Sequence, residues 1–384
     1  MMWMNILLTL SSVLLLLYAV LILFYRQWFL KLQLYVKPAG MQPATRFSVI
    51  IPARDEEEQI GACVLAILQQ HYPAYLYEVI VIDDHSTDNT AAIIQQLQQT
   101  YANLHLMQLA KELQGQQLNS YKKKAIEMAI GRSTGDWIIT TDADCALGPQ
   151  WLATYNAYIQ EQRPVFVAAP VMFSSPANFV GIFQCLDFMS MQGITAAAVS
   201  AGVHSMCNGA NLAYNKEAFY AVGGFKGIDA IASGDDMLLM HKIKQAYPGK
   251  TGYIFSADAI VSTAPMPDWK SFINQRIRWA SKADKYKDKA VFWVLVLVYC
   301  MNLCLLLLLL TGLIHWAFMG WALALIGIKT VVELCFLFPV ARFFNQCALL
   351  NWFAIMQPFH IAYIVVAGWL GKFGKYQWKG RTVK

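Results

Sequence analysis

The clearest indication of the fold is the segment Val79-Ile-Val-Ile-Asp-Asp-His-Ser-Thr-Asp88. Its apolar first half is typical of a strand buried in a parallel sheet, and its second half places acidic residues where that strand ends. A similar run lies upstream at Phe47–Ile51, and others follow at Leu104–Leu109, Trp137–Thr140 and Val165–Ala169. Because helical patterns alternate with these runs, residues 45–265 are predicted to form an α/β domain with a mainly parallel, Rossmann-like sheet.

Composition places another part of the chain in lipid. The 384 residues are 57% hydrophobic and only 14% charged, whereas soluble domains carry about 25% charged residues. Lys and Arg exceed Asp and Glu by 30 − 24 = 6, a modest surplus that fits membrane-facing loops better than a nucleic-acid groove. Eight scattered cysteines without a CxxC pair argue against a disulfide-stapled secreted domain.

Two apolar blocks are long enough to cross a bilayer of about 30 Å. Residues 1–26 are predicted to form a retained N-terminal anchor, because no basic residue precedes the apolar run and no cleavage pattern follows it. Residues 291–371 are predicted to form three further helices, at about 291–313, 316–340 and 348–370. Within that block Lys329 and Glu333 lie four positions apart, which favours an internal ion pair or a polar contact in a substrate path.

Basic residues indicate which membrane side is cytoplasmic. Arg26, Lys31 and Lys37 follow the first apolar block, and another group precedes the second block at Arg278, Lys282, Lys285, Lys287 and Lys289. The catalytic domain is therefore expected in the cytoplasm, on the inner or plasma membrane. Three C-terminal crossings would put the basic tail at 372–384 outside, against the charge rule, unless one segment is re-entrant.

Acidic residues gather at the predicted carboxyl ends of strands, where ligands of such sheets bind. Asp83 and Asp84 end one strand, and Asp142 and Asp144 follow another. Alternate carboxylates can bind one hard cation such as Mg²⁺ or Mn²⁺. Helix capping is the simpler interpretation of each group alone, and Asp55 is itself predicted to cap the first helix.

Two further groups suggest catalytic chemistry. Asp235 and Asp236 precede a helical pattern and could cap it, or one could act as a general base. Gln275, Arg278 and Trp279 lie on a predicted amphipathic helix at residues 266–290. Interfacial anchoring would explain an Arg and a Trp there, but a guanidinium can also bind a diphosphate while an indole stacks on a sugar.

Together these motifs resemble the membrane-bound family 2 glycosyltransferases of GT-A fold, over residues 47–280. The resemblance rests on several segments in the family's order: Ser48-Val-Ile-Ile-Pro-Ala-Arg-Asp-Glu-Glu57, Val81–Asp88, Thr141-Asp-Ala-Asp144, Gly209-Ala-Asn211, Gly223-Gly-Phe225, Gly234-Asp-Asp236 and Gln275-Arg-Ile-Arg-Trp279. The last segment is similar to the QxxRW motif of polysaccharide synthases and ceramide glucosyltransferases. Two positions depart from the family pattern: His85 stands where glycine is common, and Asp235 where glutamate is common.

The resemblance implies inverting, metal-dependent transfer of a sugar from a nucleotide-sugar, expected to be a UDP-sugar. Asp236 would be the base, with Asp235 beside it, and Asp144 with Asp142 would bind Mg²⁺ or Mn²⁺. Gln275, Arg278 and Trp279 would contact acceptor and diphosphate. The donor and its nucleotide would be bound by Pro52, Ala53, Arg54, Asp55, Glu57, Asp83, Asp84, Lys124, Asp142, Asp144, Gly209 and Asn211.

Several alternatives stay open at this stage. The acceptor is expected to be a lipid or lipid-linked sugar, because so few helices would form only a thin wall for a polysaccharide channel. QxxRW, however, also fits a processive polysaccharide synthase. A nucleotidyltransferase, from another enzyme class, also uses aspartates on such a sheet, although QxxRW has no obvious task there. A membrane protein without catalytic activity is a further alternative. The oligomeric state is not indicated by these residues, and no nucleic-acid partner is expected.

Overall fold

A computed structural model describes residues 2–113, 120–174, 176, 178–229, 231, 234–281, 288–374, 376–378 and 381–383. The predicted basic approach at Lys282, Lys285 and Lys287 lies outside these residues, as do Lys375, Lys379, Gly380 and Lys384 of the predicted tail. The chain divides into two compact units. We call residues 33–172 and 199–264 the α/β unit, and residues 1–32, 173–198 and 265–384 the helical unit.

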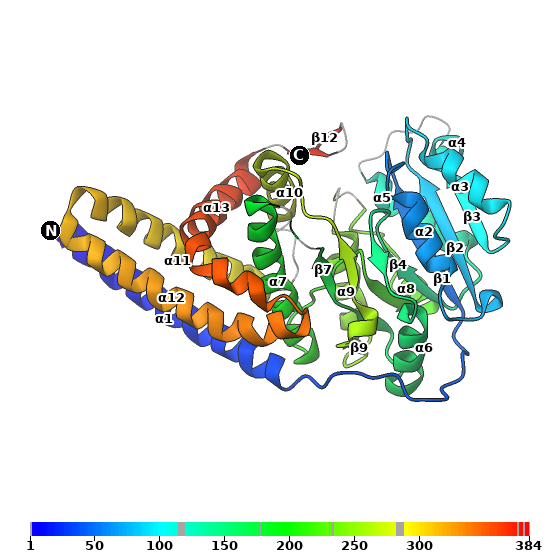
Figure 1. Cartoon of the computed structure of the whole chain (residues 1–384), viewed down its shortest axis with the longest axis horizontal. Coiled ribbons are helices and arrows are strands. Elements are labelled where there is room, and N and C mark those ends of the chain that lie inside the picture. Colours follow the sequence, from blue (N-terminus) through cyan, green and yellow to red (C-terminus); the bar gives the residue numbers. More distant parts are fainter. Residues whose placement is uncertain are drawn as a thin grey trace. The chain divides into compact units, whose positions relative to one another are not determined.

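The α/β unit is built on a sheet whose order, among the described residues, is β3-β2-β1-β4-β8-β6-β9 (Figure 1). Strands β1, β2, β3 and β4 are mutually parallel, whereas β8 runs antiparallel to both β4 and β6. The strands are β1 Phe47–Ala53, β2 Tyr77–Asp83, β3 Leu104–Gln108, β4 Trp137–Thr140, β6 Phe166–Ala168, β8 Leu212–Asn215 and β9 Thr251–Tyr253. The predicted α/β class with a mainly parallel sheet is confirmed.

The central strands form where β-branched side chains can be buried on both faces. Val49 of β1 pairs with Val79 of β2 on one side and with Ile139 of β4 on the other, and all three are fully buried. In the same register Ala53 lies opposite Asp83. The carboxyl ends of β1, β2 and β4 therefore share one edge of the sheet.

Helices cover this sheet and bury the predicted apolar faces, such as Ile60, Val64 and Ile67 of α2. The α-helices of the unit are α2 Ile60–Leu68, α3 Thr90–Gln98, α4 Leu109–Leu113, α5 Tyr121–Arg132, α6 Trp151–Gln162, α8 Lys216–Ala221 and α9 Asp235–Ala246. Short elements complete it: η1 Ala74–Leu76, η2 Ala257–Ala259, and a small sheet of β5 Ala146–Leu147, β10 Val261–Thr263 and β7 Val171–Phe173. The predicted helix cap at Asp55 is wrong, because α2 begins only at Ile60.

The helical unit contains the long apolar helices. Five helices among the described residues are long and apolar enough to cross a membrane, judged by length and composition: α1 Met2–Leu30, α7 Phe179–Ser200, α11 Lys289–Ile314, α12 Trp316–Phe343, and the segment joining η4 Cys347–Trp352 to α13 Phe353–Phe373. The unit also contains α10 Trp269–Ala280 and the hairpin of β11 Tyr376–Trp378 and β12 Arg381–Val383. The sequence interpretation missed α7, whose mean hydropathy of 1.2 is the lowest of the five.

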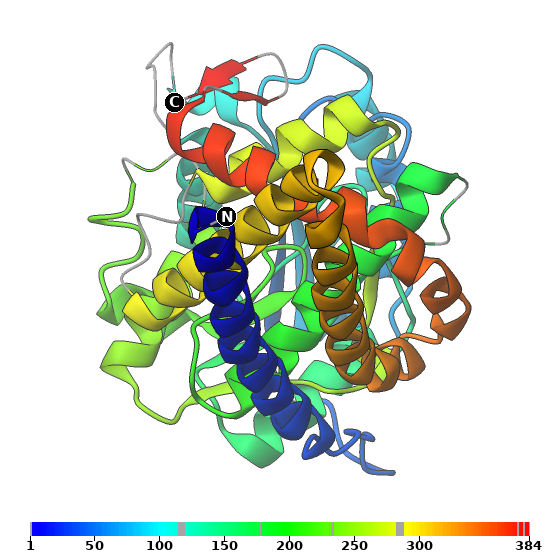
Figure 2. The same cartoon turned by 90° about the vertical axis from the view of Figure 1, so that its left-hand side faces the viewer.

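Two glycines lie where helices of the helical unit approach each other closely. Gly312 lies against Met319, since a Cβ at this glycine would be 2.9 Å from the Met319 Cα, so α11 and α12 form a close antiparallel hairpin (Figure 2). Gly371, near the end of α13, lies against Ala280 at the end of α10. The last turn of α13 therefore lies beside the residue where α10 ends.

The predicted ion pair of Lys329 and Glu333 is present and buried. The Lys329 Nζ lies 2.8 Å from Glu333 Oε1 and donates to Gln357 Oε1 at 2.8 Å. The Tyr18 hydroxyl also donates to Glu333, at 2.5 Å. Buried charges are tolerated when they are fully partnered. This network joins α1, α12 and α13.

Candidate active site

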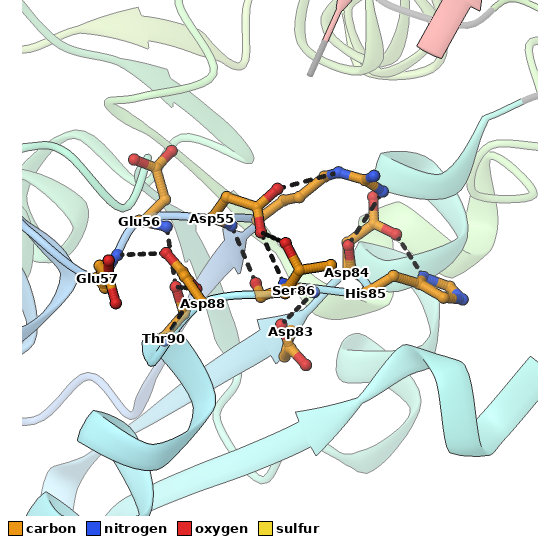
Figure 3. A network of polar contacts seen from close by, with 11 residues as sticks. Asp55, Glu56, Glu57, Asp83, Asp84, His85, Ser86, Asp88 and Thr90 are labelled. Atoms are coloured by element: carbon orange, nitrogen blue, oxygen red, sulfur yellow. Dashed lines mark hydrogen bonds and ion pairs between the residues drawn. The ribbon is translucent and has the colours of Figure 1, made fainter. Parts of the chain in front are cut away.

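The loops that follow β1 and β2 hold each other through acidic side chains (Figure 3). Asp55 accepts a hydrogen bond from the Thr87 N–H at 2.7 Å, and Glu57 accepts one from the Asn89 N–H at 2.9 Å. In return, Asp88 accepts a hydrogen bond from the Glu57 N–H at 3.0 Å. Three acidic side chains thus stabilise two backbone turns.

These bonds also affect the charge of Asp88. Burial acts to raise its pKa, but hydrogen bonds from Thr90 and from the Glu57 N–H outweigh burial and lower the pKa. Asp55 adopts a left-handed φ of 49° to reach Thr87, and its second oxygen lies 3.7 Å from the Arg54 Nε. Asp55 therefore lies partly exposed at the rim of this edge.

Asp84 lies at the centre of the same edge, with only 4% of its surface exposed. Its N–H donates to the carbonyl of Ala53 at 2.8 Å, and its carbonyl accepts from Arg54 at 3.3 Å. Its carboxylate contacts the Nδ1 of His85 at 2.9 Å. The structure therefore brings Asp84 together with the predicted segment Pro52-Ala53-Arg54, while Asp83 accepts the Ser86 N–H at 3.0 Å.

His85 occupies a backbone conformation that usually favours glycine. Its φ is 58°, and its ring makes an edge-on contact with Tyr121 at 5.6 Å between centroids. A left-handed conformation costs a non-glycine residue roughly 1 kcal/mol or more. The imidazole thus fixes the Asp84 carboxylate at a conformational cost.

A lysine joins the two acidic groups that lie far apart in the sequence. The Lys122 Nζ, from the first turn of α5, lies 2.9 Å from Asp142 Oδ1 and 3.9 Å from Asp235 Oδ2. Burial acts to lower the pKa of Lys122, but Asp142 and then Asp235 outweigh it and raise the pKa above its ordinary value. A permanent positive charge therefore lies between the residues that follow β4 and those that begin α9.

The predicted lysine, Lys124, pairs with a residue of its own helix. Its ammonium lies 3.3 Å from Glu127 on its own helix, and its side chain is 43% exposed. Consecutive positions on a helix point about 100° apart, so only one lysine of three can face the sheet edge. That lysine is Lys122.

Asp236 is held by backbone donors at the start of α9. Its Oδ2 accepts from the Gly209 N–H at 3.1 Å and its Oδ1 from the Met237 N–H at 2.7 Å. The Gly209 carbonyl in turn accepts from the Thr140 hydroxyl at the end of β4, at 2.8 Å. The loop at Gly209 thus links the predicted base to the strand that precedes Asp142 and Asp144.

Asp142 and Asp144 offer a chemically suitable but incomplete cation site. The Asp142 side chain is 41% exposed, and Asp144 accepts a hydrogen bond from the Thr263 hydroxyl at 2.9 Å. Among the described residues no group of three or more His, Cys, Asp and Glu side chains could hold a metal alone. Mg²⁺ commonly uses one or two carboxylates and completes its shell with substrate phosphates and water. The two aspartates fit that mode.

Asn211, predicted to contact the donor, lies in a buried network of hydrogen bonds. It is fully buried, and its Oδ1 accepts from Trp151 at 3.0 Å and from Tyr155 at 2.9 Å. Its Nδ2 donates to the carbonyls of Pro170 and Ala259, each at 2.7 Å. With every hydrogen-bonding position used, Asn211 fixes the loop that carries Gly209.

The nearby thiols are not candidates for nucleophilic catalysis. Burial raises the pKa of Cys63 to about 12, and burial with the neighbouring Asp142 raises that of Cys145 well above normal. Because the thiolate is the reactive form, both cysteines stay protonated and serve as packing groups.

Gln275, Arg278 and Trp279 lie on α10 in the helical unit. Arg276 is buried on this helix together with Phe272 and Ile277. It pairs with Asp187 of α7 at 2.8 Å, and its guanidinium carbon lies 4.1 Å from the Trp279 ring centroid. Gln275 accepts a hydrogen bond from Arg276 at 3.2 Å. Sequence reasoning missed Lys122, Arg276 and Asp187. That Gln275, Arg278 and Trp279 meet Asp144 and Asp236 at one diphosphate stays a prediction.

Comparisons with known proteins place this geometry in a family. The model for glycosyl transferase family 2 matches residues 48–223, and the model for glycosyl transferase family group 2 matches residues 137–369. Glycosyltransferase AglE of Haloferax volcanii is 29% identical over 213 residues, covering 56% of this chain and 65% of that protein. The beta-monoglucosyldiacylglycerol synthase of Synechocystis sp. is 31% identical over 133 residues, covering 35% of this chain and 26% of that protein. The chain thus spans less than two thirds of these relatives' own length.

A solved structure agrees with the fold. A mannosyltransferase from Pyrobaculum calidifontis, in complex with GDP-Man and Mn²⁺, superposes with a TM-score of 0.59 at 20% sequence identity. The superposition covers 95% of this chain and 98% of that one. The fold is therefore GT-A-like, with a mostly parallel sheet.

Proposed function

This chain belongs to the glycosyl transferase family group 2, and from that premise we propose that it transfers a sugar, with inversion, from a nucleotide-sugar to a lipid or lipid-linked acceptor at the cytosolic membrane face. The proposal rests mainly on the position of Lys122 between two acidic segments. One ammonium group lies beside Asp142 and Asp235, so the cation-binding and base-bearing segments reach the same edge of the α/β unit.

The donor would bind along the ends of β1, β2 and β4. Asp55 and Asp84, held by their loops, would accept hydrogen bonds from the base and ribose. The leaving diphosphate would lie near Lys122, whose permanent charge stabilises anionic oxygen. An enzyme gains rate only from contacts that strengthen in the transition state, and charge on the leaving oxygen grows there.

A divalent cation fits beside this position. Asp144 and Asp142 would hold Mg²⁺ or Mn²⁺, which, when bound, supplies positive charge to the leaving diphosphate. The Thr263 hydroxyl orients Asp144 by its hydrogen bond. Asp142, whose carboxylate contacts Lys122, would also offer an oxygen to the ion. Carboxylate oxygens suit these hard cations better than the nearby thiols would.

Asp236 would remove the acceptor's proton. Its carboxylate is fixed by N–H groups of Gly209 and Met237, which hold both oxygens in place while leaving lone pairs for a hydroxyl. Attack from the side of the sugar opposite the diphosphate inverts the anomeric centre. General-base help of this kind contributes about 10²- to 10⁴-fold to the rate.

The apolar helices favour an acceptor embedded in the bilayer. Leu16, Leu17 and Val20 of α1 and Leu323 and Val331 of α12 are largely exposed, which suits contact with lipid tails. One relative of 31% identity is named as a glycolipid synthase. A lipid acceptor bound at such helices would bring its head group to the aqueous interface.

Radiolabelled donors test the proposal. Full-length protein in detergent, given membrane lipid extract and a panel of UDP- and GDP-sugars, is expected to move one sugar into the organic phase. Asp236→Asn should keep donor binding and lose at least 100-fold in transfer. Asp144→Ala, like EDTA, should weaken donor binding. A long water-soluble polymer would contradict the lipid acceptor, and full turnover by Asp236→Asn would contradict the base.

A further inference from the structure

A groove on the helical unit combines apolar walls with positive charge. It has a volume of about 510 Å³ and lies between α1 and α12, which pack against each other. Leu30 of α1 and Val331, Leu334, Phe338 and Pro339 of α12 form its walls together with Cys335, and Arg26 and Arg342 supply the charge. None of these residues belongs to the proposed donor, cation or base site.

Pro339 explains why Arg26 lies in this groove. A proline inside a helix has no N–H for the carbonyl four residues earlier, which here is Cys335. The Arg26 Nε donates to that carbonyl at 3.0 Å. The bond uses one of five guanidinium N–H groups and fixes the rest of the guanidinium at the groove.

The two arginines give the groove a net positive charge. Neither Arg26 nor Arg342 forms an ion pair with a carboxylate in the part of the chain that the structure describes. The carboxyl end of α12 offsets part of the Arg342 charge through the helix dipole. Two like charges on one small groove still create a positive potential that favours an anionic ligand.

The walls determine what kind of anion fits. Leu30 and Phe338 are each 52% exposed and Val331 is 61% exposed, so the ligand must be apolar over most of its length. We infer that the groove binds an anionic glycerophospholipid, with its phosphate at Arg26 and Arg342 and its acyl chain against Val331, Leu334 and Phe338. Arginines near the cytosolic end of a helix would meet head groups at that depth.

Native mass spectrometry of the full-length protein tests the site. The detergent-solubilised protein is titrated with phosphatidylglycerol or phosphatidylcholine, and the lipid concentration that half-saturates one retained lipid is measured. Wild type is expected to prefer phosphatidylglycerol by tenfold or more. Arg342→Gln should weaken that binding about fivefold, since one basic residue near a membrane surface contributes on the order of 1 kcal/mol.

Lys31→Gln is the matched control, because Lys31 directly follows α1 and is exposed but does not line the groove. It should change phosphatidylglycerol binding less than twofold. The double change Arg26→Gln and Arg342→Gln should abolish the preference. Arg342→Gln leaves the bond to Cys335 intact, so its result stands even if the double variant folds poorly. Equal loss in Lys31→Gln, equal binding of both lipids, or no effect of Arg342→Gln would each overturn the inference.

Discussion

Lys122 is the residue on which the proposed donor site most depends. It lies between Asp142 and Asp235, and its loss would leave carboxylates of two segments facing each other. Lys122→Met is expected to raise the donor KM at least tenfold, because both the diphosphate contact and this neutralisation are lost. The KM is measured from nucleotide release over a range of donor concentrations.

Lys124→Met is the control, since Lys124 pairs with Glu127 on the exposed side of α5. Its donor KM should stay within twofold of wild type. Lys122→Arg should recover part of the affinity by restoring the charge. If Lys124→Met were the more damaging change, the assignment of Lys122 to the donor site would fail.

Replacing His85 by glycine is expected to raise the stability of the fold and to lower the affinity for the donor. His85→Gly removes a left-handed φ of 58° from a non-glycine residue, which should stabilise the fold by about 1 kcal/mol and raise Tm by roughly 2–4 °C. The same change frees the Asp84 carboxylate, so donor affinity should fall. Differential scanning fluorimetry and donor titration measure the two effects.

Arg163→Gly is the control for the effect of backbone strain on stability. Arg163 ends α6 with a φ of 46° and contacts none of the acidic loops described above. Arg163→Gly should therefore stabilise the protein without changing donor affinity. An unchanged donor affinity in His85→Gly would show that His85 does not position Asp84.

At the level of residues, the sequence predicted which carboxylates follow strands but not which partners they have. Asp84 and Asp142 could be placed because a strand's end is visible in the pattern. The register of Lys122 to Lys124 could not, because only tertiary packing selects one face of a short helix. Asn211 follows a glycine and an alanine, as an exposed turn residue would, and nothing local reveals the four partners that bury it.

At the level of elements, strands and membrane-type helices were predictable because their apolar runs are long and uninterrupted. The predicted helix 316–340 is observed as α12 Trp316–Phe343. Helix α7 was missed because it is buried by packing rather than by lipid and carries polar residues such as Gln184 and Asp187. Helix α2 begins late because Asp55 and Glu57 bind the neighbouring loop instead of their own helix.

The pair of α7 and α10 makes a prediction about stability. Arg276 and Asp187 are both buried, with side chains 2% and 6% exposed, so removing one partner leaves an unpaired charge that costs about 3–5 kcal/mol. Arg276→Met alone should be strongly destabilising. The double variant with Asp187→Leu should recover much of that loss. Chemical unfolding in detergent measures the free energy of unfolding of wild type, of each single variant and of the double variant.

The same pair is expected to affect transfer through Trp279. The Arg276 guanidinium lies against the indole, and a lysine cannot reproduce that flat contact. Arg276→Lys should therefore raise the acceptor KM while leaving donor KM unchanged. Additive losses of stability in the two single variants would show that Arg276 and Asp187 do not stabilise each other. An unchanged acceptor KM in Arg276→Lys would show that Arg276 does not position Trp279.

For the whole molecule, basic residues and helix contacts together favour three crossings rather than four. Helices α11 and α12 form a hairpin, so α12 ends on the side where α11 begins. Helix α13 starts soon after α12 ends, and its Gly371 lies against Ala280, shortly before α11 begins. We therefore predict that both ends of α13 lie toward the same side, which would remove the conflict between the basic tail and the positive-inside rule.

Cysteine labelling in whole cells tests this arrangement. The exposed Cys335 and Cys347 are first replaced by serine, and a single cysteine is introduced either at His315, between α11 and α12, or at Gly374, after α13. An impermeant maleimide should label the His315→Cys variant in intact cells, because that turn faces outward. The Gly374→Cys variant should react only after permeabilisation, since a re-entrant α13 would return the chain to the cytoplasm. Labelling of Gly374→Cys in intact cells would mean that α13 crosses the bilayer and that the basic tail lies outside in spite of its charge.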